Sequence, residues 1–232
     1  MIISKTPYRI SFFGGGSDYP AHCNKFGGQV LSTTIDKYCY ITMRDLPPFF
    51  NHKYRIVYSK IEHVNDIYEI QHPVIRAVLQ NYFKQNSGLE IHHDGDLPAR
   101  SGLGSSSAFA VGFFNTLSAK IGTLKTPKEL ADYAINLEQE ILRENVGYQD
   151  QIAVANGGLN RIVFYPNGGY KVEKVSLSTE RVNELNSNLL LFFTGITRLS
   201  SVIAKAQVDS TLKNQDMLIK MAQMVDEGIN IL

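Results

Sequence analysis

The sequence is poor in cysteine, in net charge and in long apolar runs. Its two cysteines, Cys23 and Cys39, form no CxxC pair and lie in no Cys/His cluster, which excludes a disulfide framework and the usual zinc sites and favours a cytoplasmic protein. Lysines and arginines total 23 against 22 aspartates and glutamates, so no general attraction to nucleic acid or to an anionic membrane is expected. The longest apolar stretches, residues 108–114 and 189–193, fall far short of the roughly 20 residues that span a bilayer. Any anion must therefore be held by a local site.

Hydrophobic residues make up 44% of the 232 positions, enough to bury the core of one large or two small domains. Alternation and β-forming composition predict strands, and apolar residues at helical spacing predict helices. The predicted strands are residues 2–13, 29–43, 54–58, 89–93, 159–165, 170–177 and 188–193. The predicted helices are residues 73–83 and 108–121, a helix that begins after residue 126, and a helical region from about residue 200. We therefore expect an α+β protein whose N-terminal half is rich in sheet.

The helix after residue 126 has the clearest local signal. Thr126 and Glu129 form a capping box, with Pro127 at the first helical position. The spacing of Leu130, Ala134, Leu137 and Ile141 predicts the buried stripe of this helix. Glu138 directly follows Leu137 of this stripe and is expected at the margin of the core.

Residues 96–108 form a loop rich in glycine and serine between a predicted strand and a predicted helix. Gly102 and Gly104 allow a tight turn and the close approach of a ligand, while the helix start points unpaired N–H groups at the turn. Phosphate oxygens complement these donors, and the three serines that follow can cap the helix or bind Mg²⁺. A flexible linker with a capping serine explains such a loop about as well. The loop has no GxxxxGK[ST], and Gly14-x-Gly16 lacks the final small residue of a dinucleotide fingerprint.

The segment Pro98-x-x-x-Gly102-Leu103-Gly104-Ser105-Ser106 resembles the central ATP-binding motif of the GHMP kinases, named for galactokinase, homoserine kinase, mevalonate kinase and phosphomevalonate kinase. The resemblance implies the two-domain GHMP kinase fold, ATP and Mg²⁺ as cofactors, and phosphoryl transfer to an alcohol. The ATP-binding residues that it implies are Pro98, Arg100, Ser101, Gly102, Leu103, Gly104, Ser105, Ser106 and Ser107.

Glu138 and Asp150 are the candidate carboxylates for phosphoryl transfer, which needs charge neutralisation, alignment and usually a carboxylate near the attacking hydroxyl. By itself a helix glutamate is far more often a surface charge, and an aspartate at a helix start is a common N-cap. Residues 147–151 resemble the Gly-x-x-Asp-Gln segment of GHMP sugar kinases, whose aspartate orients or deprotonates the acceptor hydroxyl. The resemblance implies Asp150 as a catalytic residue facing the glycine loop across a cleft, and Ser106 and Glu138 as magnesium ligands.

Residues 9–19 run from a strand into a glycine turn and resemble the N-terminal sugar-binding motif of the same family. Taken alone, Arg9 is as readily a structural ion-pair residue, and Asp18 a turn-forming residue. The resemblance implies that Arg9 is catalytic, lying beside Asp150 and stabilising negative charge during transfer. It also implies that Asp18 accepts hydrogen bonds from sugar hydroxyls. The implied substrate-binding residues are Gly14, Gly15, Gly16, Ser17, Asp18 and Tyr19.

The turn departs from galactokinases, which have a Glu-His pair where Gly15 and Gly16 stand. It is similar instead to heptose 7-phosphate kinases, a resemblance that extends through residues 102–109 and 147–158. This implies phosphorylation of the anomeric hydroxyl of D-glycero-D-manno-heptose 7-phosphate to the 1,7-bisphosphate, for polysaccharide synthesis. A kinase for fucose or a hexose derivative, and a non-catalytic nucleotide- or sugar-binding homologue, stay open as alternatives. The basic residues that are equal candidates for binding the 7-phosphate are Arg44, Lys53, Arg55, Lys60, Arg100 and Arg198.

The resemblance divides the chain into an N-terminal ATP-binding and catalytic domain, residues 1–180, and the start of a C-terminal domain, residues 181–232. GHMP kinases carry a third, glycine-rich motif late in the C-terminal domain, and no segment after Gly195 resembles it. We therefore expect a truncated C-terminal domain. The expected partners are ATP and a small sugar phosphate, and the oligomeric state is open, a homodimer included.

Overall fold

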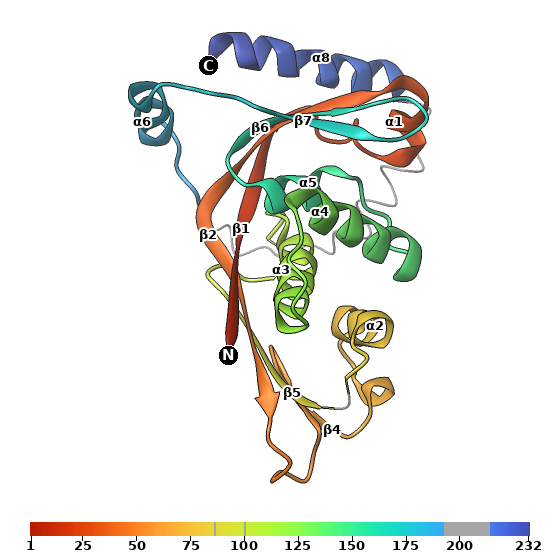
Figure 1. Cartoon of the computed structure of the whole chain (residues 1–232). Helices are drawn as coiled ribbons and strands as arrows, with labels where there is room; N and C mark the ends of the chain where they lie inside the picture. Colours follow the sequence, from red (N-terminus) through yellow and green to blue (C-terminus); the bar gives the residue numbers. More distant parts are fainter. Residues whose placement is uncertain (86, 100, 193–213) are drawn as a thin grey trace.

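The structure is a computed structural model that describes residues 1–85, 87–99, 101–192 and 214–232. The described residues contain a seven-stranded mixed sheet and helices on both of its faces (Figure 1). The strands are β1 Ile2–Phe13, β2 Gly28–Leu46, β3 Tyr54–Val57, β4 Ile61–Val64, β5 Gly88–Gly95, β6 Leu159–Phe164 and β7 Tyr170–Lys174. The helices are α1 Pro20–Phe26, α2 Pro73–Tyr82, α3 Ser105–Lys120, α4 Pro127–Asn136, α5 Gln149–Asn156, α6 Thr179–Ser187 and α8 Gln215–Ile231, with a 3-10 turn at Ile67–Glu69 and a π-helical turn at Leu137–Ile141.

The long strand β2 is the centre of the sheet. It pairs antiparallel with β1, β5 and β6. The strand order across the sheet is β4-β3-β5-β2-β6-β7, and β1 pairs with β2 outside this order. Strand β3 runs parallel to β5. Because β2 is 19 residues long, one half of it pairs with β6 near the glycine turn and the other half with β5 at the far end of the sheet.

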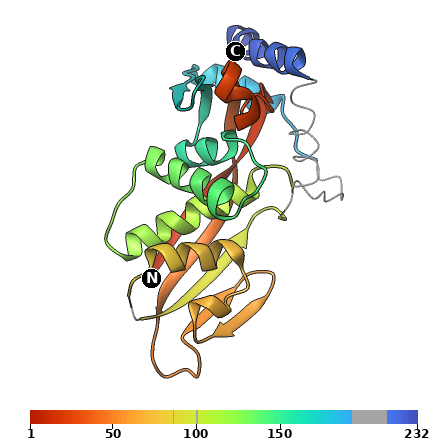
Figure 2. The ribbon, with the colours of Figure 1, turned by 90° about the vertical axis from the view of Figure 1, so that its right-hand side faces the viewer.

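Helices α2, α3, α4 and α5 lie against one face of the sheet (Figures 1 and 2). The side chains of Ile41 and Met43 from β2 are fully buried with Phe113 and Leu117 of α3 in the larger of two apolar clusters. A smaller cluster joins Val30 of β2 to α4 and α5. The burial of these faces is the main stabilising contribution to the arrangement.

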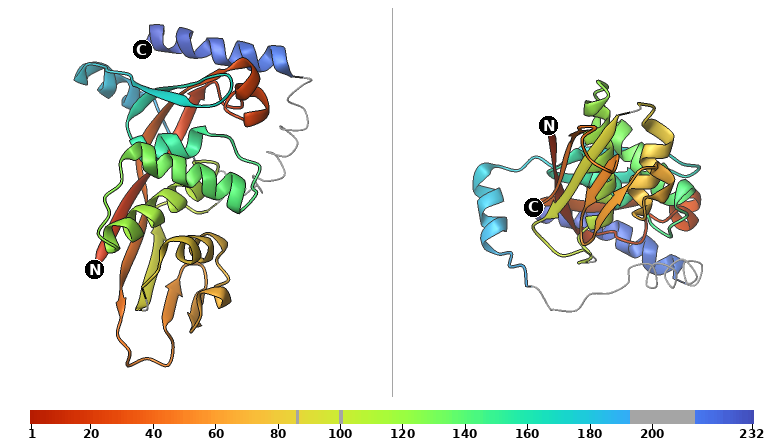
Figure 3. Two further views of the ribbon diagram at one scale, coloured as in Figure 1. Left: turned by 45° about the vertical axis from the view of Figure 1, so that its right-hand side comes forward. Right: turned by 90° about the horizontal axis from the view of Figure 1, so that it is seen from below.

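The C-terminal helix α8 packs on the opposite face, at the end of the sheet that carries the glycine turn (Figures 1 and 3). Successive residues of a strand point to opposite faces, so Leu31 faces α8 although its neighbour Val30 faces α4 and α5. A Cβ at Gly228 of α8 would lie 2.7 Å from the Phe13 ring, which shows how closely helix and sheet approach. Val225 of α8 is fully buried there.

The predicted mixed fold is confirmed, and most of the predicted elements are found within a few residues of their expected ends. Residues 188–192, predicted as part of a strand, form no strand, and Leu190 is 81% exposed. The predicted stripe after Thr126 is wrong at Ile141, which is 38% exposed because the helix changes to a π turn at Leu137.

The C-terminal helical region is described from Gln215 onward, and residues 193–213 lie outside the described residues. The predicted division at residue 180 stays a prediction. No helix within the described ranges is both long and apolar enough to cross a membrane.

Candidate active site

Arg9 and Asp150 form a two-pronged ion pair between β1 and the first turn of α5. The Arg9 Nε atom donates to Asp150 Oδ1 at 2.8 Å, and Arg9 Nη2 donates to Asp150 Oδ2 at 2.6 Å. The side chain of Arg9 is 12% exposed and that of Asp150 is 29% exposed. Such a fork geometry fixes the carboxylate in orientation as well as in charge, and it leaves the aspartate accessible from solvent.

The glycine loop lies directly beside this pair. Arg9 Nη1 donates to the Gly102 carbonyl at 2.9 Å, and the Arg9 backbone N–H donates to the Leu103 carbonyl at 3.1 Å. Gly104 has a φ of +74°, and a Cβ there would lie 3.2 Å from Arg9 Cγ and 3.7 Å from Asp150 Oδ2. The loop and Asp150 thus lie close together as predicted, while the cleft expected between them stays a prediction.

Helix α3 starts from this loop, with Gly104 as its N-cap in the left-handed conformation. The N-cap position is thus held by a glycine, which has no side chain to cap the helix, and not by one of the serines that the sequence offered for it. The start of a helix directs backbone N–H groups and the positive end of the helix dipole toward the loop, an arrangement that suits an anion. Arg100, predicted to bind ATP, lies outside the described residues.

Glu138 is buried in the π turn and contacts Ser107 instead of the predicted Ser106. The Ser107 hydroxyl donates to Glu138 Oε2 at 3.0 Å, and Gln151 Nε2 donates to the same oxygen, whereas Ser106 is exposed on the first turn of α3. Burial, with smaller contributions from the charges of Glu144 and Asp150, raises the pKa of Glu138 to about 7. The predicted position at the margin of the core is wrong, because the π turn rotates Glu138 fully into the interior.

The oxygen atoms around Glu138 fit a magnesium ion. Within the described residues, Gln151 Oε1 is buried without a hydrogen-bond partner and no cation is paired with Glu138. A bound divalent cation would supply the missing positive charge, and Mg²⁺ commonly takes one or two protein oxygens and completes its shell with water and substrate phosphates. The carboxylate of Glu138 with a serine hydroxyl of the first turn of α3 matches that pattern.

The glycine turn, residues 14–18, is held mostly by its own polar groups. Ser17 is fully buried and its hydroxyl donates to the Gly14 carbonyl at 2.7 Å. Asp18 is 1% exposed, and its oxygens accept from the N–H groups of Gly16 and Gln149 and from the Gln149 side chain. Burial and the charge of Asp150 raise the pKa of Asp18 to about 6. Its predicted sugar contact stays a prediction, and this burial weighs against it.

Residues 67–158 match the GHMP kinases N terminal domain, and this range contains the glycine loop, the Glu138 π turn and Asp150. The matched segment of this chain is thus similar to the N-terminal domain of the GHMP kinases. The D-glycero-alpha-D-manno-heptose 7-phosphate kinase of Campylobacter jejuni is 29% identical over 85% of the chain and 60% of its own length. The bifunctional fucokinase/GDP-fucose pyrophosphorylase of Arabidopsis thaliana is 25% identical over 95% of the chain and 23% of its own length. The chain thus spans less than two thirds of these relatives.

A solved structure with the same fold is titled a D-glycero-D-manno-heptose 1-phosphate kinase from Bacteriodes thetaiotaomicron. It superposes with a TM-score of 0.74 over 96% of this chain and 74% of that one, at 24% sequence identity. At this identity the likeness shows the fold, and it confirms the predicted GHMP kinase architecture.

Two of the basic residues predicted as candidates for a sugar 7-phosphate lie far from the candidate active site. Arg9 is paired in register with Thr34, whereas Arg44 lies ten residues further along β2, at the far end of the sheet where β2 pairs with β5. Arg44 and Arg55 both pair there with the buried Glu90. Arg198 and Arg100 lie outside the described residues.

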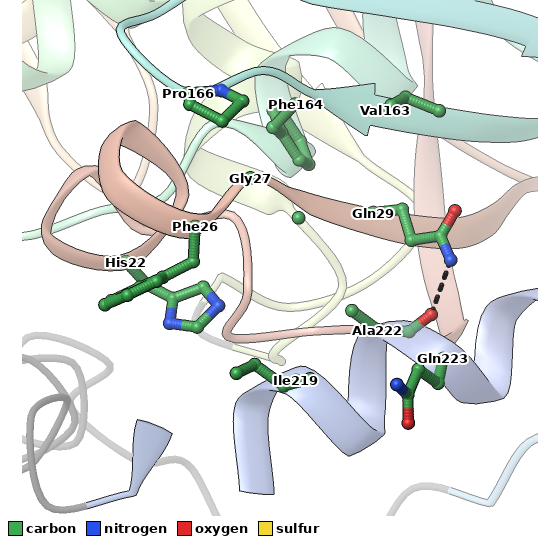
Figure 4. Close-up of a pocket in the computed structure, with 11 residues that line it drawn as sticks. His22, Phe26, Gly27, Gln29, Val163, Phe164, Pro166, Ile219, Ala222 and Gln223 are labelled. Atoms are coloured by element: carbon green, nitrogen blue, oxygen red, sulfur yellow. Dashed lines mark hydrogen bonds between the residues drawn. The ribbon is translucent and has the colours of Figure 1, made fainter. Parts of the chain in front are cut away.

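An open cavity of about 340 Å³ lies between α1, β6 and α8 (Figure 4). Its walls are the apolar side chains of Phe26, Phe164 and Ile219 with the buried imidazole of His22, whose pKa burial lowers. None of its lining residues belongs to the glycine loop or to the Arg9–Asp150 pair. The cavity is therefore separate from the candidate active site around Asp150.

Sequence reasoning missed three polar side chains around the site. Ser11, Gln149 and Gln151 each hydrogen-bond a residue of the predicted machinery or its neighbour. The signal was present only in part: both glutamines flank Asp150 in the sequence, but their partners come from distant segments.

Proposed function

We propose that this chain belongs to an ATP-dependent sugar kinase, a phosphotransferase with an alcohol as acceptor. The observation that carries the proposal is the contact between the Arg9-paired carboxylate of Asp150 and the glycine loop at the start of α3. A carboxylate that can take a proton thus stands beside a backbone surface suited to phosphate. The match to the GHMP kinase N-terminal domain supports the same conclusion.

In the proposed reaction, the phosphates of ATP lie on the N–H groups of residues 102–107. The acceptor hydroxyl oxygen attacks the γ-phosphorus, the bond to the bridging oxygen breaks, and ADP leaves. Asp150 orients the hydroxyl and receives its proton, while Arg9 stabilises the negative charge that the phosphoryl group carries. Glu138 with Ser106 or Ser107 would hold Mg²⁺, which when bound neutralises charge on the phosphate oxygens.

The acceptor is proposed to be D-glycero-D-manno-heptose 7-phosphate, phosphorylated at its anomeric hydroxyl, with residues 14–19 as the sugar-binding segment. The likeness to the Campylobacter jejuni enzyme and the Gly15-Gly16 pair in place of Glu-His support this substrate. A kinase for fucose is the second candidate, because a fucokinase is also among the relatives. Heptose metabolism for surface polysaccharide, in the cytoplasm, is part of the proposal.

The test is ADP release by the purified chain with Mg²⁺-ATP and one of three acceptors. These are the heptose 7-phosphate, fucose, and mannose 6-phosphate, a hexose phosphate that lacks the seventh carbon. We expect turnover with the heptose 7-phosphate at a kcat/KM at least about tenfold above the others, since contacts to one buried polar group discriminate by that amount or more. Turnover with fucose alone would favour the second candidate. No turnover with any acceptor, while nucleotide still binds, would favour a non-catalytic homologue.

Asp150→Asn is the matched variant for this assay, with the exposed Asp36→Asn as control. We expect phosphoryl transfer to fall about 10²- to 10⁴-fold in Asp150→Asn, because an amide cannot accept the proton, while ATP affinity stays within about twofold. Asp36→Asn should match the wild type. Loss of ATP binding in Asp150→Asn without loss of transfer at saturating ATP would move Asp150 to a different role.

A further inference from the structure

Gln149 connects three segments that meet at the site. Its Oε1 atom accepts from the Ser11 hydroxyl of β1 at 2.6 Å, and its Nε2 atom donates to Asp18 Oδ1 of the glycine turn at 3.0 Å. Its backbone N–H donates to the other Asp18 oxygen at 3.1 Å. The next residue along α5 is Asp150. One side chain therefore ties strand, turn and helix together next to the proposed base.

Asp18, the partner of Gln149, is held in place by further contacts. Asp18 Oδ1 also accepts from the Gly16 N–H at 2.9 Å, and the Asp18 carbonyl accepts from the Tyr148 N–H at 3.3 Å. A Cβ at residue 147 would lie 1.9 Å from Asp18 Oδ2, so the backbone before Gln149 is pressed against this carboxylate. Displacing Gln149 would leave a buried carboxylate short of a donor, which is costly in a protein interior.

The residue on the other side of Asp150 is anchored in the same manner. Gln151 Nε2 donates to the buried Glu138, on the π turn after α4. Both neighbours of Asp150 thus hold their amide groups on buried carboxylates, while Asp150 itself points to Arg9 and the glycine loop. Asp150 therefore lies between two residues whose side chains are anchored on buried carboxylates.

We propose that Gln149 is a positioning residue for Asp150, and that Asp18 acts on the reaction through Gln149 by locking the glycine turn to the start of α5. The inference rests on the proposed phosphoryl transfer and adds a residue to it. It assigns Asp18 a role that its 1% exposure permits. In-line transfer depends on the placement of the base, and a displacement of about 1 Å can cost on the order of 100-fold in rate.

The test compares Gln149→Met with Gln139→Met. Methionine has nearly the length of glutamine and removes both side-chain hydrogen bonds of Gln149 while the backbone N–H remains. Gln139 is the matched control, because its Nε2 atom donates to the Val146 carbonyl at 2.9 Å in the same part of the chain but touches neither Asp18 nor Asp150. Transfer kinetics, thermal unfolding, and the NMR resonance of the Asp150 carboxyl carbon are measured for both variants.

For Gln149→Met we expect kcat to fall about 10- to 100-fold with KM for ATP within about twofold, and the Asp150 resonance to move. Gln139→Met should lose a comparable amount of stability with kcat near that of the wild type and the Asp150 resonance unmoved. A kcat within about twofold of the wild type in Gln149→Met, or an Asp150 resonance that does not move, overturns the inference. An equal loss of kcat in both variants also overturns it, because destabilisation alone would then explain the effect.

The NMR measurement separates this inference from the proposed function. If the wild-type chain transfers no phosphate to any acceptor, the proposed function fails, yet the Asp150 resonance still shows whether Gln149 positions that carboxylate. If the wild type is active and the resonance is unmoved in Gln149→Met, the positioning role fails alone.

Discussion

At the scale of single residues, Gly102 and Gly104 show two different reasons for a glycine in one loop. Both have a positive φ, of +78° and +74°. An alanine in this conformation destabilises the folded state by about 1 to 2 kcal/mol. A Cβ at Gly102 would meet no atom within 4 Å, whereas one at Gly104 would press on the Arg9 side chain. The two positions therefore separate backbone strain from displacement of the ion pair.

We expect Gly102→Ala and Gly104→Ala to lose similar stability, but only Gly104→Ala to lower kcat at saturating ATP strongly, by about 10- to 100-fold, because it moves Arg9 and with it Asp150. Gly102→Ala, on the proposed phosphate surface, should act on the KM for ATP instead. Urea denaturation and the ADP-release assay measure the two effects. Equal loss of transfer in both variants would show that strain in the loop, and not the position of Arg9, limits the reaction.

The buried Glu138 makes stability depend on pH. Its pKa is about 7 in the folded protein against 4.5 as the ordinary value, so the folded state keeps a proton that the unfolded state has already lost between these limits. Its contribution to the free energy of unfolding is therefore fully present below about pH 4.5 and is lost as the pH rises through 7.

In Glu138→Gln this loss is absent, and a neutral amide can also donate to the unpartnered Gln151 Oε1. Without nucleotide and Mg²⁺, we expect the free energy of unfolding of the variant to exceed that of the wild type by about 1 to 3 kcal/mol at pH 8 and to equal it near pH 5. Chemical denaturation at both pH values checks this, with the exposed Glu227→Gln as control. A constant difference across the range would contradict it.

Single residues were predictable where the chemistry is local. The placement of Asp150 at a helix start, and of the glycines in a loop before a helix, follows from short segments and is confirmed. The partner of Glu138 was not predictable, because the π turn shifts Glu138 relative to an α-helix and brings it to Ser107. The bridge from Gln149 to Asp18 joins residues 131 positions apart, which no local pattern reveals.

At the scale of elements, α3 and β1 approach so closely at Gly112 that a side chain there, which helix propensity favours, would clash with β1. A Cβ at Gly112 of α3 would lie 2.6 Å from Thr6 Oγ1, and the Gly112 carbonyl accepts from the Ser4 hydroxyl at 3.0 Å. Alanine in place of a glycine inside a helix ordinarily stabilises by about 1 kcal/mol. Overpacking of a tight contact costs typically about 1 to 3 kcal/mol.

We therefore expect Gly112→Ala to destabilise the protein by about 1 to 2 kcal/mol in urea denaturation, against the trend of helix propensity. The double variant Gly112→Ala with Thr6→Ala should recover most of the loss, because it removes the nearest oxygen and leaves the residue-6 Cβ at an ordinary contact distance of 3.5 Å. A Gly112→Ala protein as stable as the wild type would show that β1 and α3 can move apart freely.

Elements with strong local signals were predicted and those set by packing were not. The capping box of Thr126 and Glu129 is present as expected, with its Pro at the first turn. Helix α1 was missed because its seven residues are too few to show a helical period. Helix α6 was missed because Val182 and Leu185 are its only apolar residues, too few to form a buried stripe. The strand expected at residues 188–193 was inferred from apolar composition, which exposed residues can also have.

At the scale of the whole molecule, α8 returns from the end of the chain to the first turn of the fold. Gln29 Nε2 donates to the Ala222 carbonyl at 2.7 Å, Arg161 pairs with Asp226 at 2.7 Å, and Gly228 lies against Phe13. The strand that leads into the glycine turn is thereby covered on its second face. No pattern along the chain predicts such a contact, because it joins residues about 200 positions apart.

Gly228→Val should release α8, since the added side chain would begin 2.7 Å from the Phe13 ring. We expect faster amide hydrogen exchange in α8 and in residues 13–16, with exchange in α3 unchanged, as only the local docking is lost. The neighbouring exposed position supplies the control, Glu227→Val, which should leave exchange in residues 13–16 unchanged. Faster exchange throughout the sheet in Gly228→Val would mean that α8 supports the entire fold.

The space between Gly147 and Asp18 has a consequence for protein engineering. Gly147 has no positive φ to explain it, but a Cβ there would lie 1.9 Å from Asp18 Oδ2, which leaves no room for a larger residue. Gly168 is the reverse case, with a φ of +95° and nothing within 4 Å. A substitution at residue 168 therefore costs backbone strain without a clash, whereas codon 147 should be left untouched in every library of variants.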